Sequence, residues 1–281
     1  MRNIRRVGFI GLGDQGGPMA EAIGEQAFDM HVWARRPASL SSVAAVPHVV
    51  HETVAGLAAS AELIGLCLRD DADIWNLLDD RHLLANVTPG TIIVNHGTGD
   101  PGEAERIGAH VAEAGAVYLD APVSGGGPGA RARTLTTFVG GSADAFESAR
   151  PVFEAFSDTV RLMGPVGGGQ FTKLFNNALT ITNMKNAEDV LALAEQVGLD
   201  LPALIEIIGA SSGGSAALRA LGRDITPELA EHLNPLMRKD MQHFAEAVRE
   251  RGAHPEEVLA RGMAGASSLL ETAHLIARTR S

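Results

Sequence analysis

The segment Val7–Gly16 reads VGFIGLGDQG, an apolar run followed by the glycines Gly11, Gly13 and Gly16. These glycines have the spacing G-x-G-x-x-G, and a stretch with helical spacing begins at Gly17. In a strand–turn–helix unit such glycines permit a tight turn, let backbone N–H groups approach a pyrophosphate and allow the helix to pack closely on the strand. A glycine-rich turn without a ligand is the alternative interpretation, but this context favours a dinucleotide-binding turn.

Outward from this segment, short β-type runs alternate with helical stretches through the first half of the chain. The predicted strands are Val7–Ile10, Met30–Trp33, His48–His51, Leu63–Leu68, Thr91–Val94, Ala116–Leu119, Leu135–Val139 and Val160–Met163. Between several of them lie the predicted helices Gly17–Gln26, Asp71–Leu78 and Glu103–Ala114. Because parallel strands need long crossovers, this alternation predicts an α/β fold with a doubly wound parallel sheet.

The second half of the chain changes character after Gly164-Pro165, where the β-type runs stop. We therefore expect a Rossmann-type domain over residues 1–163 and an all-α domain over residues 164–281. Apolar residues recur every three or four positions from Gly169 to Val197, which predicts one helix of about 40 Å that ends at Gly198. This helix either carries a dimer interface or links the two domains. Further predicted helices are Pro202–Ile208, Pro227–Leu233, Leu236–Arg251 and Pro255–Arg278.

Composition excludes several classes of protein. The 281 residues carry a net charge of -11, 45% of them are apolar and only 4% are aromatic. Nucleic-acid binding is not expected, because it needs a basic face or stacking aromatics. The single cysteine, Cys67, cannot form an intramolecular disulfide, which favours a reducing compartment. The apolar run Val7–Gly13 is too short for a signal peptide, and Val54–Leu68 is interrupted by polar residues, so we expect a cytoplasmic protein without a membrane span.

The end of the second predicted strand indicates the cofactor. NAD-binding sites usually have a carboxylate there that accepts a hydrogen bond from the ribose 2′-OH, whereas an arginine accommodates a 2′-phosphate. This sequence has Ala34-Arg35-Arg36 and no carboxylate at that point. Guanidinium groups match phosphate geometry, so the pattern favours NADP(H), with Arg35 as the preferred phosphate ligand, and leaves NAD(H) open. Solvated arginines without a ligand are the alternative.

Two further segments carry polar groups that suit a small substrate. Asp120-Ala121-Pro122-Val123-Ser124-Gly125-Gly126 follows the sixth predicted strand, at the sheet edge where α/β proteins bind ligands. Its backbone N–H groups and the Ser124 hydroxyl suit a carboxylate, although the same residues also make ordinary turns. At the start of the long helix, Lys173 and Asn177 are four residues apart and share a helix face. A lone helical lysine is usually a solvated charge, so Lys173 gains meaning only in combination.

In combination, the glycine-rich turn, D-A-P-V-S-G-G, the lysine motif G-x-G-x-x-x-K-x-x-N-N and the later Lys239-Asp240 resemble the β-hydroxyacid dehydrogenase family in order and spacing. This family includes 3-hydroxyisobutyrate dehydrogenase, tartronate semialdehyde reductase and glyoxylate/succinic semialdehyde reductases. The resemblance covers essentially the whole chain. It implies an NADP(H)-dependent oxidoreductase that transfers hydride between the nicotinamide and a short 3-hydroxy acid or its semialdehyde.

The resemblance also implies roles for single residues. Lys173 is the expected acid/base, and because a lysine with its ordinary pKa of about 10.4 is a poor base, the site must lower that pKa or relay the proton. The expected substrate-binding residues are Ser124, Gly125, Gly126 and Asn177. The expected cofactor-binding residues are Gly11, Leu12, Gly13, Asp14, Gln15, Gly16, Arg35, Arg36, Thr98 and Lys239. Lys239 and Asp240 are alternatively an exposed pair on a helix surface. The family habit and the long helix imply a homodimer or homotetramer.

Three departures from the family pattern limit this transfer. Gly97 stands where the family commonly has a serine before its threonine. Arg133, with Arg131 nearby, stands where a glycine is usual, and either reaches a second acidic group of the substrate or is a surface replacement, which we favour. The segment 211–215 carries the side chains that tune substrate choice in this family, and its sequence does not identify the substrate.

Other functions remain as alternatives. An imine reductase shares this architecture but usually lacks the lysine, and a non-catalytic NADPH-binding module would not need Lys173. The 6-phosphogluconate dehydrogenases have a much larger helical domain than the segment after Met163. The ten histidines are scattered, and His48 and His51 lack a third ligand, so we expect no catalytic metal.

Overall fold

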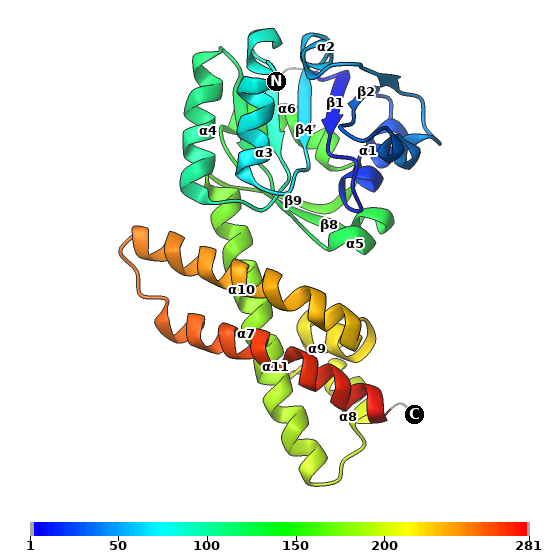
Figure 1. The fold of residues 1–281 in the computed structure, drawn as a ribbon, viewed down its shortest axis with the longest axis vertical. Coiled ribbons are helices and arrows are strands. Elements are labelled where there is room, and N and C mark those ends of the chain that lie inside the picture. Colours follow the sequence, from blue (N-terminus) through cyan, green and yellow to red (C-terminus); the bar gives the residue numbers. More distant parts are fainter. Residues whose placement is uncertain (1–2, 280–281) are drawn as a thin grey trace. The chain divides into compact units, whose positions relative to one another are not determined.

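A computed structural model describes residues 3–279 of the chain. The chain forms two compact units, residues 1–173 and residues 174–281 (Figure 1). The first unit contains the sheet and the second unit is helical, which confirms the predicted α/β class with a helical C-terminal part. The functional boundary that the sequence places after Met163 stays a prediction.

The first unit is built on a nine-stranded sheet. Its strands are β1 (Arg6–Ile10), β2 (Asp29–Trp33), β3 (Val49–Val50), β4 (Leu63–Leu66), β5 (Ile92–Asn95), β6 (Val117–Asp120), β7 (Val123–Ser124), β8 (Leu135–Gly140) and β9 (Ser157–Gly164). Their order is β3-β2-β1-β4-β5-β6-β8-β7, and β9 pairs with β8. The strands β1 to β6 pair in parallel, as predicted. The sheet is mixed rather than wholly parallel, because β8 pairs antiparallel with both β6 and β7.

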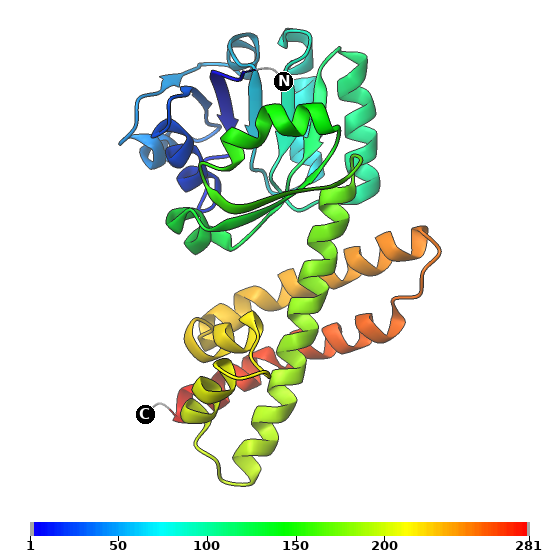
Figure 2. The same ribbon diagram turned by 180° about the vertical axis from the view of Figure 1, so that it is seen from behind.

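Helices cover both faces of this sheet. They are α1 (Gly16–Gly24), α2 (Val54–Ser60), α3 (Asp71–Trp75), α4 (Pro101–Glu113), α5 (Gly126–Ala132) and α6 (Ala143–Phe153), with the short helical turns η1 (Pro37–Val43), η2 (Asn76–Asp80) and η3 (Leu84–Asn86). The helices α3 and α4 lie in front of the sheet in Figure 1, and α6 lies in front in the reverse view of Figure 2. The prediction missed α2, α5 and α6.

Two hydrophobic clusters, one on each face of the sheet, explain why consecutive residues along a strand are apolar. On β1, Phe9 packs into the cluster that contains α1 and α6, whereas Ile10 packs into the cluster of α2, α3 and α4. Successive strand residues point to opposite faces, so both must be apolar when both faces are covered. The strands β4 and β5 are buried along their whole length for the same reason.

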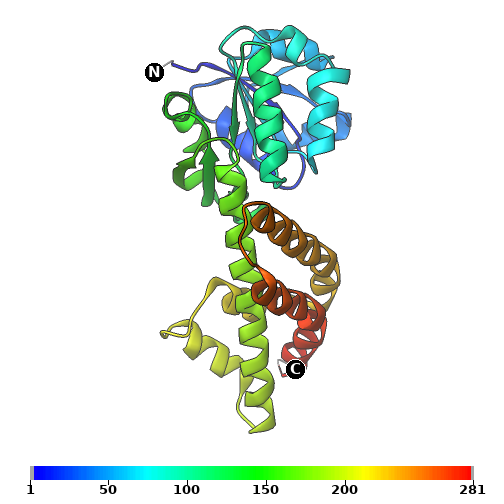
Figure 3. The same cartoon turned by 90° about the vertical axis from the view of Figure 1, so that its left-hand side faces the viewer.

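The second unit consists of the later part of α7 (Gly168–Gln196) with α8 (Leu201–Gly209), α9 (Ala216–Arg223), α10 (Pro227–Glu250) and α11 (Glu256–Thr279). The long helix is confirmed, and Gly198 after its end has a φ of +79°, which suits glycine. Two separate helices around Pro235 were predicted, which is wrong: α10 continues through Pro235. It forms an antiparallel pair with α11 (Figure 3). Gly262 of α11 lies against Met241 of α10, where a Cβ atom would meet the Met241 side chain at 2.6 Å.

No helix among residues 3–279 is both long and apolar enough to span a bilayer.

Candidate active site

The glycine-rich turn between β1 and α1 has the geometry that its sequence predicts. Gly11 has a φ of +101°, and a Cβ atom there would lie 2.1 Å from the Cys67 carbonyl oxygen. At Gly16 a Cβ atom would lie 2.0 Å from the Gly11 carbonyl oxygen. No protein atom lies within 4 Å of the Cβ position of Gly13. Packing therefore requires glycine at positions 11 and 16, while Gly13 leaves open backbone that a ligand can approach.

Helix α1 begins at this turn without a side-chain cap. Gln15 occupies the N-cap position, and its side chain makes no cap hydrogen bond but donates to the Cys67 Sγ atom at 3.7 Å. The first N–H groups of a helix lack intrahelical partners and favour a negative charge. The start of α1 is thus suited to a phosphate group.

Next to the turn lies a pocket of about 200 Å³. It is lined by Ile10, Gly11, Leu12, Gly13, Trp33, Ala34, Arg35, Arg36, Ser39, Cys67, Leu68, Arg69, Asp73, Asn76, Leu77 and Arg81. The structure thus brings together five of the predicted cofactor residues, namely Gly11, Leu12, Gly13, Arg35 and Arg36. The predicted residues Asp14, Gln15, Gly16, Thr98 and Lys239 are not among those that line it. The pocket nevertheless joins the glycine-rich turn to the end of β2, the two features from which the sequence predicts dinucleotide binding.

The pocket is strongly basic. Two arginines that sequence reasoning missed, Arg69 and Arg81, join Arg35 and Arg36 in its lining. Arg69 donates to Asp70 Oδ2 at 2.9 Å, and the Arg81 guanidinium lies 5.7 Å from the centre of the Trp33 ring. Arg69 follows β4 and Arg81 follows η2, so only the strand order, which places β4 beside β1, brings them here.

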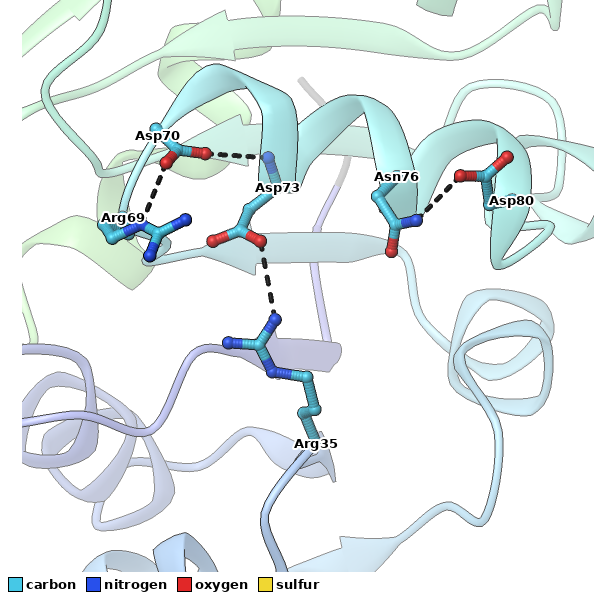
Figure 4. A network of polar contacts seen from close by, with 6 residues as sticks. All are labelled: Arg35, Arg69, Asp70, Asp73, Asn76 and Asp80. Atoms are coloured by element: carbon cyan, nitrogen blue, oxygen red, sulfur yellow. Dashed lines mark hydrogen bonds and ion pairs between the residues drawn. The ribbon is translucent and has the colours of Figure 1, made fainter.

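A single carboxylate, that of Asp73, stands among these lining arginines. Its Oδ1 atom lies 3.5 Å from Arg35 Nη1, and its side chain is 23% exposed. Figure 4 shows Arg35 pointing from the β2 side toward α3, which carries Asp73, with Arg69 and Asp70 at the start of that helix. Asp70 caps α3 by accepting from the Asp73 backbone N–H at 3.0 Å.

The acidic residue of the glycine-rich turn has a basic partner. Asp14 Oδ1 accepts from Arg131 Nη1 of α5 at 2.7 Å. A carboxylate beside a phosphate-binding turn would repel the ligand, and Arg131 offsets that charge. Arg133 pairs with Glu25 at the end of α1, and both side chains are partly exposed. Arg131 and Arg133 are thus both engaged in ion pairs near α1, and for Arg133 this agrees with the interpretation as a surface replacement.

The predicted carboxylate-binding segment follows β6 directly. Ser124 ends β7, and Gly125 and Gly126 have φ values of +129° and +59°, which favour glycine. Gly127, in the first turn of α5, lies so close to Asp14 that a Cβ atom would be 2.1 Å from its Oδ2 atom. The segment Ser124–Gly126 and the glycine-rich turn are thus neighbours at the same edge of the sheet.

A buried carboxylate fixes the start of α7. Asp120, at the end of β6, is fully buried and accepts from the backbone N–H groups of Gly167 and Gln170, each at 2.8 Å. Burial raises the pKa of Asp120 to about 6, and these backbone hydrogen bonds act in the opposite direction. Gly169 lies against this site, since a Cβ atom there would be 2.5 Å from the Phe138 carbonyl oxygen. Asp120 therefore joins the sheet to the helix that carries Lys173.

Gln170 connects the same helix to the loop after β5. Its Oε1 atom accepts from the Gly99 N–H at 2.8 Å, and its Nε2 atom donates to the Gly97 carbonyl at 2.8 Å. The side chain is fully buried. Thr98, a predicted cofactor residue, lies between these two hydrogen bonds. Lys173 follows Gln170 by one helical turn, so Gln170 fixes Thr98 and the first turn of α7 together. The sequence did not indicate this role of Gln170, because a glutamine in a glycine-rich segment matches no recognisable motif.

His96, at the start of this loop after β5, anchors the loop in the hydrophobic core. It is buried among Phe9, Phe153 and Phe156, and its Nδ1 atom lies 3.0 Å from the Ala121 carbonyl oxygen. Burial lowers the pKa of His96 to about 4, so the ring is neutral at physiological pH. The ring then carries its proton on Nδ1 and donates it to Ala121.

The remaining predicted residues lie in the second unit. Asn177 Nδ2 donates to Asp240 Oδ2 at 2.8 Å, which joins α7 to α10. The two motif positions that the sequence separates by 63 residues are therefore in contact. Lys239 is exposed on α10.

The histidines form no metal centre in the described part of the chain, where no three His, Cys, Asp or Glu side chains are suitably grouped. His51 instead pairs with His31 of β2, with Nδ1 of His31 2.9 Å from Nε2 of His51. Burial lowers the pKa of His31, and the neighbouring His51 adds to this effect. His48 contacts the Val46 carbonyl oxygen.

The fold and the pocket define a class of protein, the oxidoreductases that bind a nicotinamide dinucleotide. Residues 6–164 match the family described as the NAD binding domain of 6-phosphogluconate dehydrogenase. Residues 167–274 match the family described as NAD-binding of NADP-dependent 3-hydroxyisobutyrate dehydrogenase. The chain therefore belongs to the β-hydroxyacid dehydrogenase family, as its motifs predicted. It is an NAD(P)-dependent hydroxyacid dehydrogenase.

Relatives agree with this assignment. The chain is 37% identical over 216 residues to the NAD-dependent L-serine dehydrogenase of Pseudomonas aeruginosa, a match that covers 76% of this chain and 72% of that protein. It is 33% identical over 221 residues to the 2-(hydroxymethyl)glutarate dehydrogenase of Eubacterium barkeri, covering 78% and 73%. The structure of the Mycobacterium tuberculosis 3-hydroxyisobutyrate dehydrogenase with L-serine has a TM-score of 0.83 at 24% identity and covers 99% of this chain and 100% of that one. This last likeness confirms the fold.

Proposed function

We propose that the protein transfers hydride between NADP(H) and a short 3-hydroxy acid or its semialdehyde, with Lys173 as the acid/base. The observation that carries the proposal is the basic pocket beside the glycine-rich turn, where Arg35 and Arg36 replace the carboxylate usual for NAD. The open backbone at Gly13 and the uncapped start of α1 suit the pyrophosphate. When bound, the nicotinamide accepts or supplies the hydride.

The substrate class follows from a feature that the relatives' substrates share. L-serine, 2-(hydroxymethyl)glutarate and 3-hydroxyisobutyrate each carry a primary alcohol on the carbon next to the one that bears a carboxylate. The backbone N–H groups of Gly125 and Gly126 and the Ser124 hydroxyl suit that carboxylate. We therefore propose substrates of the form HOCH₂–CHR–COO⁻ and the corresponding semialdehydes.

The position of Lys173 in α7 supports the proposed acid/base role. It lies one turn after Gln170, in the part of α7 that Asp120 fixes on the sheet. In the oxidation of the alcohol, the Lys173 amine would take the hydroxyl proton as the hydride leaves the carbon. In the reverse direction the ammonium group would donate a proton to the carbonyl oxygen. Asn177 would orient the hydroxyl group.

The proposal extends to assembly and location. Leu179 and Leu193 of α7 and Val197, the residue after its end, have 62%, 61% and 73% of their surface exposed, which supports burial against a second copy in a homodimer or homotetramer. A mass equal to that of the 29.4 kDa chain in size-exclusion chromatography with light scattering would contradict this. We further propose that the enzyme is cytoplasmic, which cell fractionation tests.

The test is a steady-state assay of the purified chain with NADPH and NADH against methylmalonate and tartronate semialdehydes, which have the proposed form. Glyoxylate and succinic semialdehyde, which do not, are assayed for comparison. The reverse reaction is measured with L-serine and 3-hydroxyisobutyrate. We expect turnover with NADPH to exceed that with NADH. Lys173→Ala should lower kcat at least about 100-fold, because general acid–base catalysis typically contributes a factor of this size.

Lys185→Ala is the matched control, because Lys185 is a lysine on the same helix that pairs with Asp189. It should retain wild-type turnover. Equal activity of Lys173→Ala and wild type would contradict the acid/base role. Tight NADPH binding without turnover of any acid would instead favour an imine reductase or a non-catalytic binding module.

A further inference from the structure

A guanidinium and a carboxylate meet at one point in the wall of the basic pocket. Arg35 Nη1 lies 3.5 Å from Asp73 Oδ1, and the two residues come from different elements, the end of β2 and α3 (Figure 4). The Arg35 side chain is 69% exposed and that of Asp73 is 23% exposed. An ion pair this long and this exposed contributes little to stability, so a ligand can separate the partners at small cost.

The Arg35–Asp73 pair offers a binding group for each form of the cofactor. NAD(H) and NADP(H) differ at the adenosine ribose, which has a 2′-hydroxyl in one and a 2′-phosphate in the other. A hydroxyl donates to a carboxylate, whereas a phosphate is recognised by guanidinium groups. The end of β2 has Arg35 but no carboxylate. Among the residues that line the pocket, Asp73 is the one carboxylate, and it contacts Arg35 directly.

We propose that Asp73 is a specificity-determining residue that supplies from α3 the carboxylate that the end of β2 lacks. With NAD(H), Asp73 accepts a hydrogen bond from the ribose 2′-OH. With NADP(H), Arg35 leaves Asp73 and binds the 2′-phosphate, which Asp73 repels. The inference rests on the proposed function only in placing the adenosine ribose of a nicotinamide dinucleotide in this pocket.

The surrounding charges set the balance between the two modes. Arg36, Arg69 and Arg81 also line the pocket, so it stays positive when Arg35 is neutralised by Asp73. Arg69 is in turn paired with Asp70. The pocket therefore favours NADP(H) while retaining an acceptor for NAD(H), and Asp73 moderates the preference rather than reversing it.

The test measures the affinities of wild type, Asp73→Asn and Asp80→Asn for NADPH and NADH. Trp33 lines the pocket, so quenching of its fluorescence reports binding without turnover. Asp80→Asn is the matched control, because it removes one negative charge from the following helical turn and its amide oxygen can still accept from Asn76. Circular dichroism and the melting temperature show that each variant is folded.

For Asp73→Asn we expect NADH to bind about tenfold more weakly, since a charged acceptor is replaced by a neutral one, and NADPH to bind about threefold more tightly. For Asp80→Asn we expect both affinities to stay within about twofold of wild type. Weakening of NADH is the decisive readout, because the loss of a merely repulsive charge would strengthen the binding of both anionic cofactors.

Three outcomes overturn the inference. They are an unchanged ratio of the two affinities in Asp73→Asn, an equal tightening of both cofactors, and a wild type that binds NADPH but not NADH. A wild type that binds neither cofactor overturns the proposed function itself. Binding of both cofactors by wild type with an unchanged ratio in the variant overturns only the role of Asp73.

Discussion

Replacing His96 by phenylalanine tests how the loop that holds Thr98 is supported. The ring of His96 lies among three phenylalanines, so a phenylalanine fits the site in shape. The variant loses the hydrogen bond to the Ala121 carbonyl oxygen. At about pH 7.5 we expect a loss of about 2 kcal/mol in the free energy of unfolding, because a buried acceptor is left without its donor.

The cost should change with pH. The pKa of His96 is about 4 in the folded protein and about 6.5 in the unfolded chain, so between these values the unfolded state binds the extra proton. Stability from neutral His96 is therefore present above about pH 6.5 and is lost as pH falls toward 4. From about pH 7.5 to 4.5 the loss is about 2.5 kcal/mol. His96→Phe cannot suffer this loss, so the mutation becomes nearly neutral at about pH 4.5.

Asp120 acts in the opposite direction within the same unit. Its pKa is about 6 in the folded protein against 3.8 ordinarily, so the folded state binds the extra proton between these values. The stability that protonated Asp120 contributes is present at low pH and is lost as pH rises through about 6. From about pH 7.5 to 4.5 this contribution to the free energy of unfolding increases by about 2 kcal/mol. In wild type the pH-dependent contributions of His96 and Asp120 to the free energy of unfolding therefore nearly cancel.

The assay is urea unfolding at several pH values, followed by tryptophan fluorescence. Both tryptophans, Trp33 and Trp75, lie in the first unit, so the signal reports on the unit that contains His96. If wild type and His96→Phe differ by the same free energy at about pH 7.5 and 4.5, then His96 titrates alike in both states and the reasoning from burial is refuted.

Three further changes have definite expected results. Gly11→Ala places a Cβ atom 2.1 Å from the Cys67 carbonyl oxygen at a φ of +101°, so NADPH affinity should fall at least about tenfold, and an unchanged dissociation constant would contradict this. Gln170→Leu leaves two backbone groups of the Thr98 loop without partners, so we expect kcat to fall about tenfold. Equal kcat values would remove Gln170 from the positioning of that loop. Arg131→Ala exposes the charge of Asp14 to the pyrophosphate, so the dissociation constant for NADPH should rise about threefold at low salt and less at high salt, and an increase that is independent of salt would contradict the electrostatic cause.

The parts of the fold that were predicted correctly are those in which local sequence and burial agree. The strands β4 and β5 are buried on both faces, so they read as uninterrupted apolar runs. The long helix α7 has a regular apolar spacing and is followed by a glycine with a positive φ, Gly198. In each case a single physical requirement acts along the whole element.

Other elements depend on interactions that the local sequence does not show. The antiparallel pairing of β8 with β6 follows from where the chain returns after α5, and the residues of β8 satisfy either direction equally well. Pro235 lies within α10, although proline usually ends a helix, and tertiary packing against α11 keeps the helix continuous. Helix α6 was missed, although Ser142 caps it and it lies between two strands that were predicted separately.

The residues of the candidate site also divide into those that the local sequence predicted and those that it did not. The glycine-rich turn and Arg35 follow one another along the chain on β1, α1 and β2, so sequence spacing alone joins them. Asp73, Arg69 and Arg81 reach the same pocket only because β4 pairs with β1. Sequence spacing carries no information about that pairing, which is why the strongest charges of the pocket after Arg35 and Arg36 were not foreseen.

The chain as a whole is negatively charged, whereas the pocket is positively charged. The distance over which charges act decides which of the two governs cofactor binding. The chain carries a net charge of -11, which would oppose a multiply charged dinucleotide. At physiological ionic strength, exposed charges are screened beyond about 8 Å, so the ligand responds mainly to the groups that line its site. Those groups are four arginines against one aspartate. The net negative charge of the chain therefore does not prevent phosphate binding. Because the lining arginines are exposed, cofactor affinity should fall as salt is added.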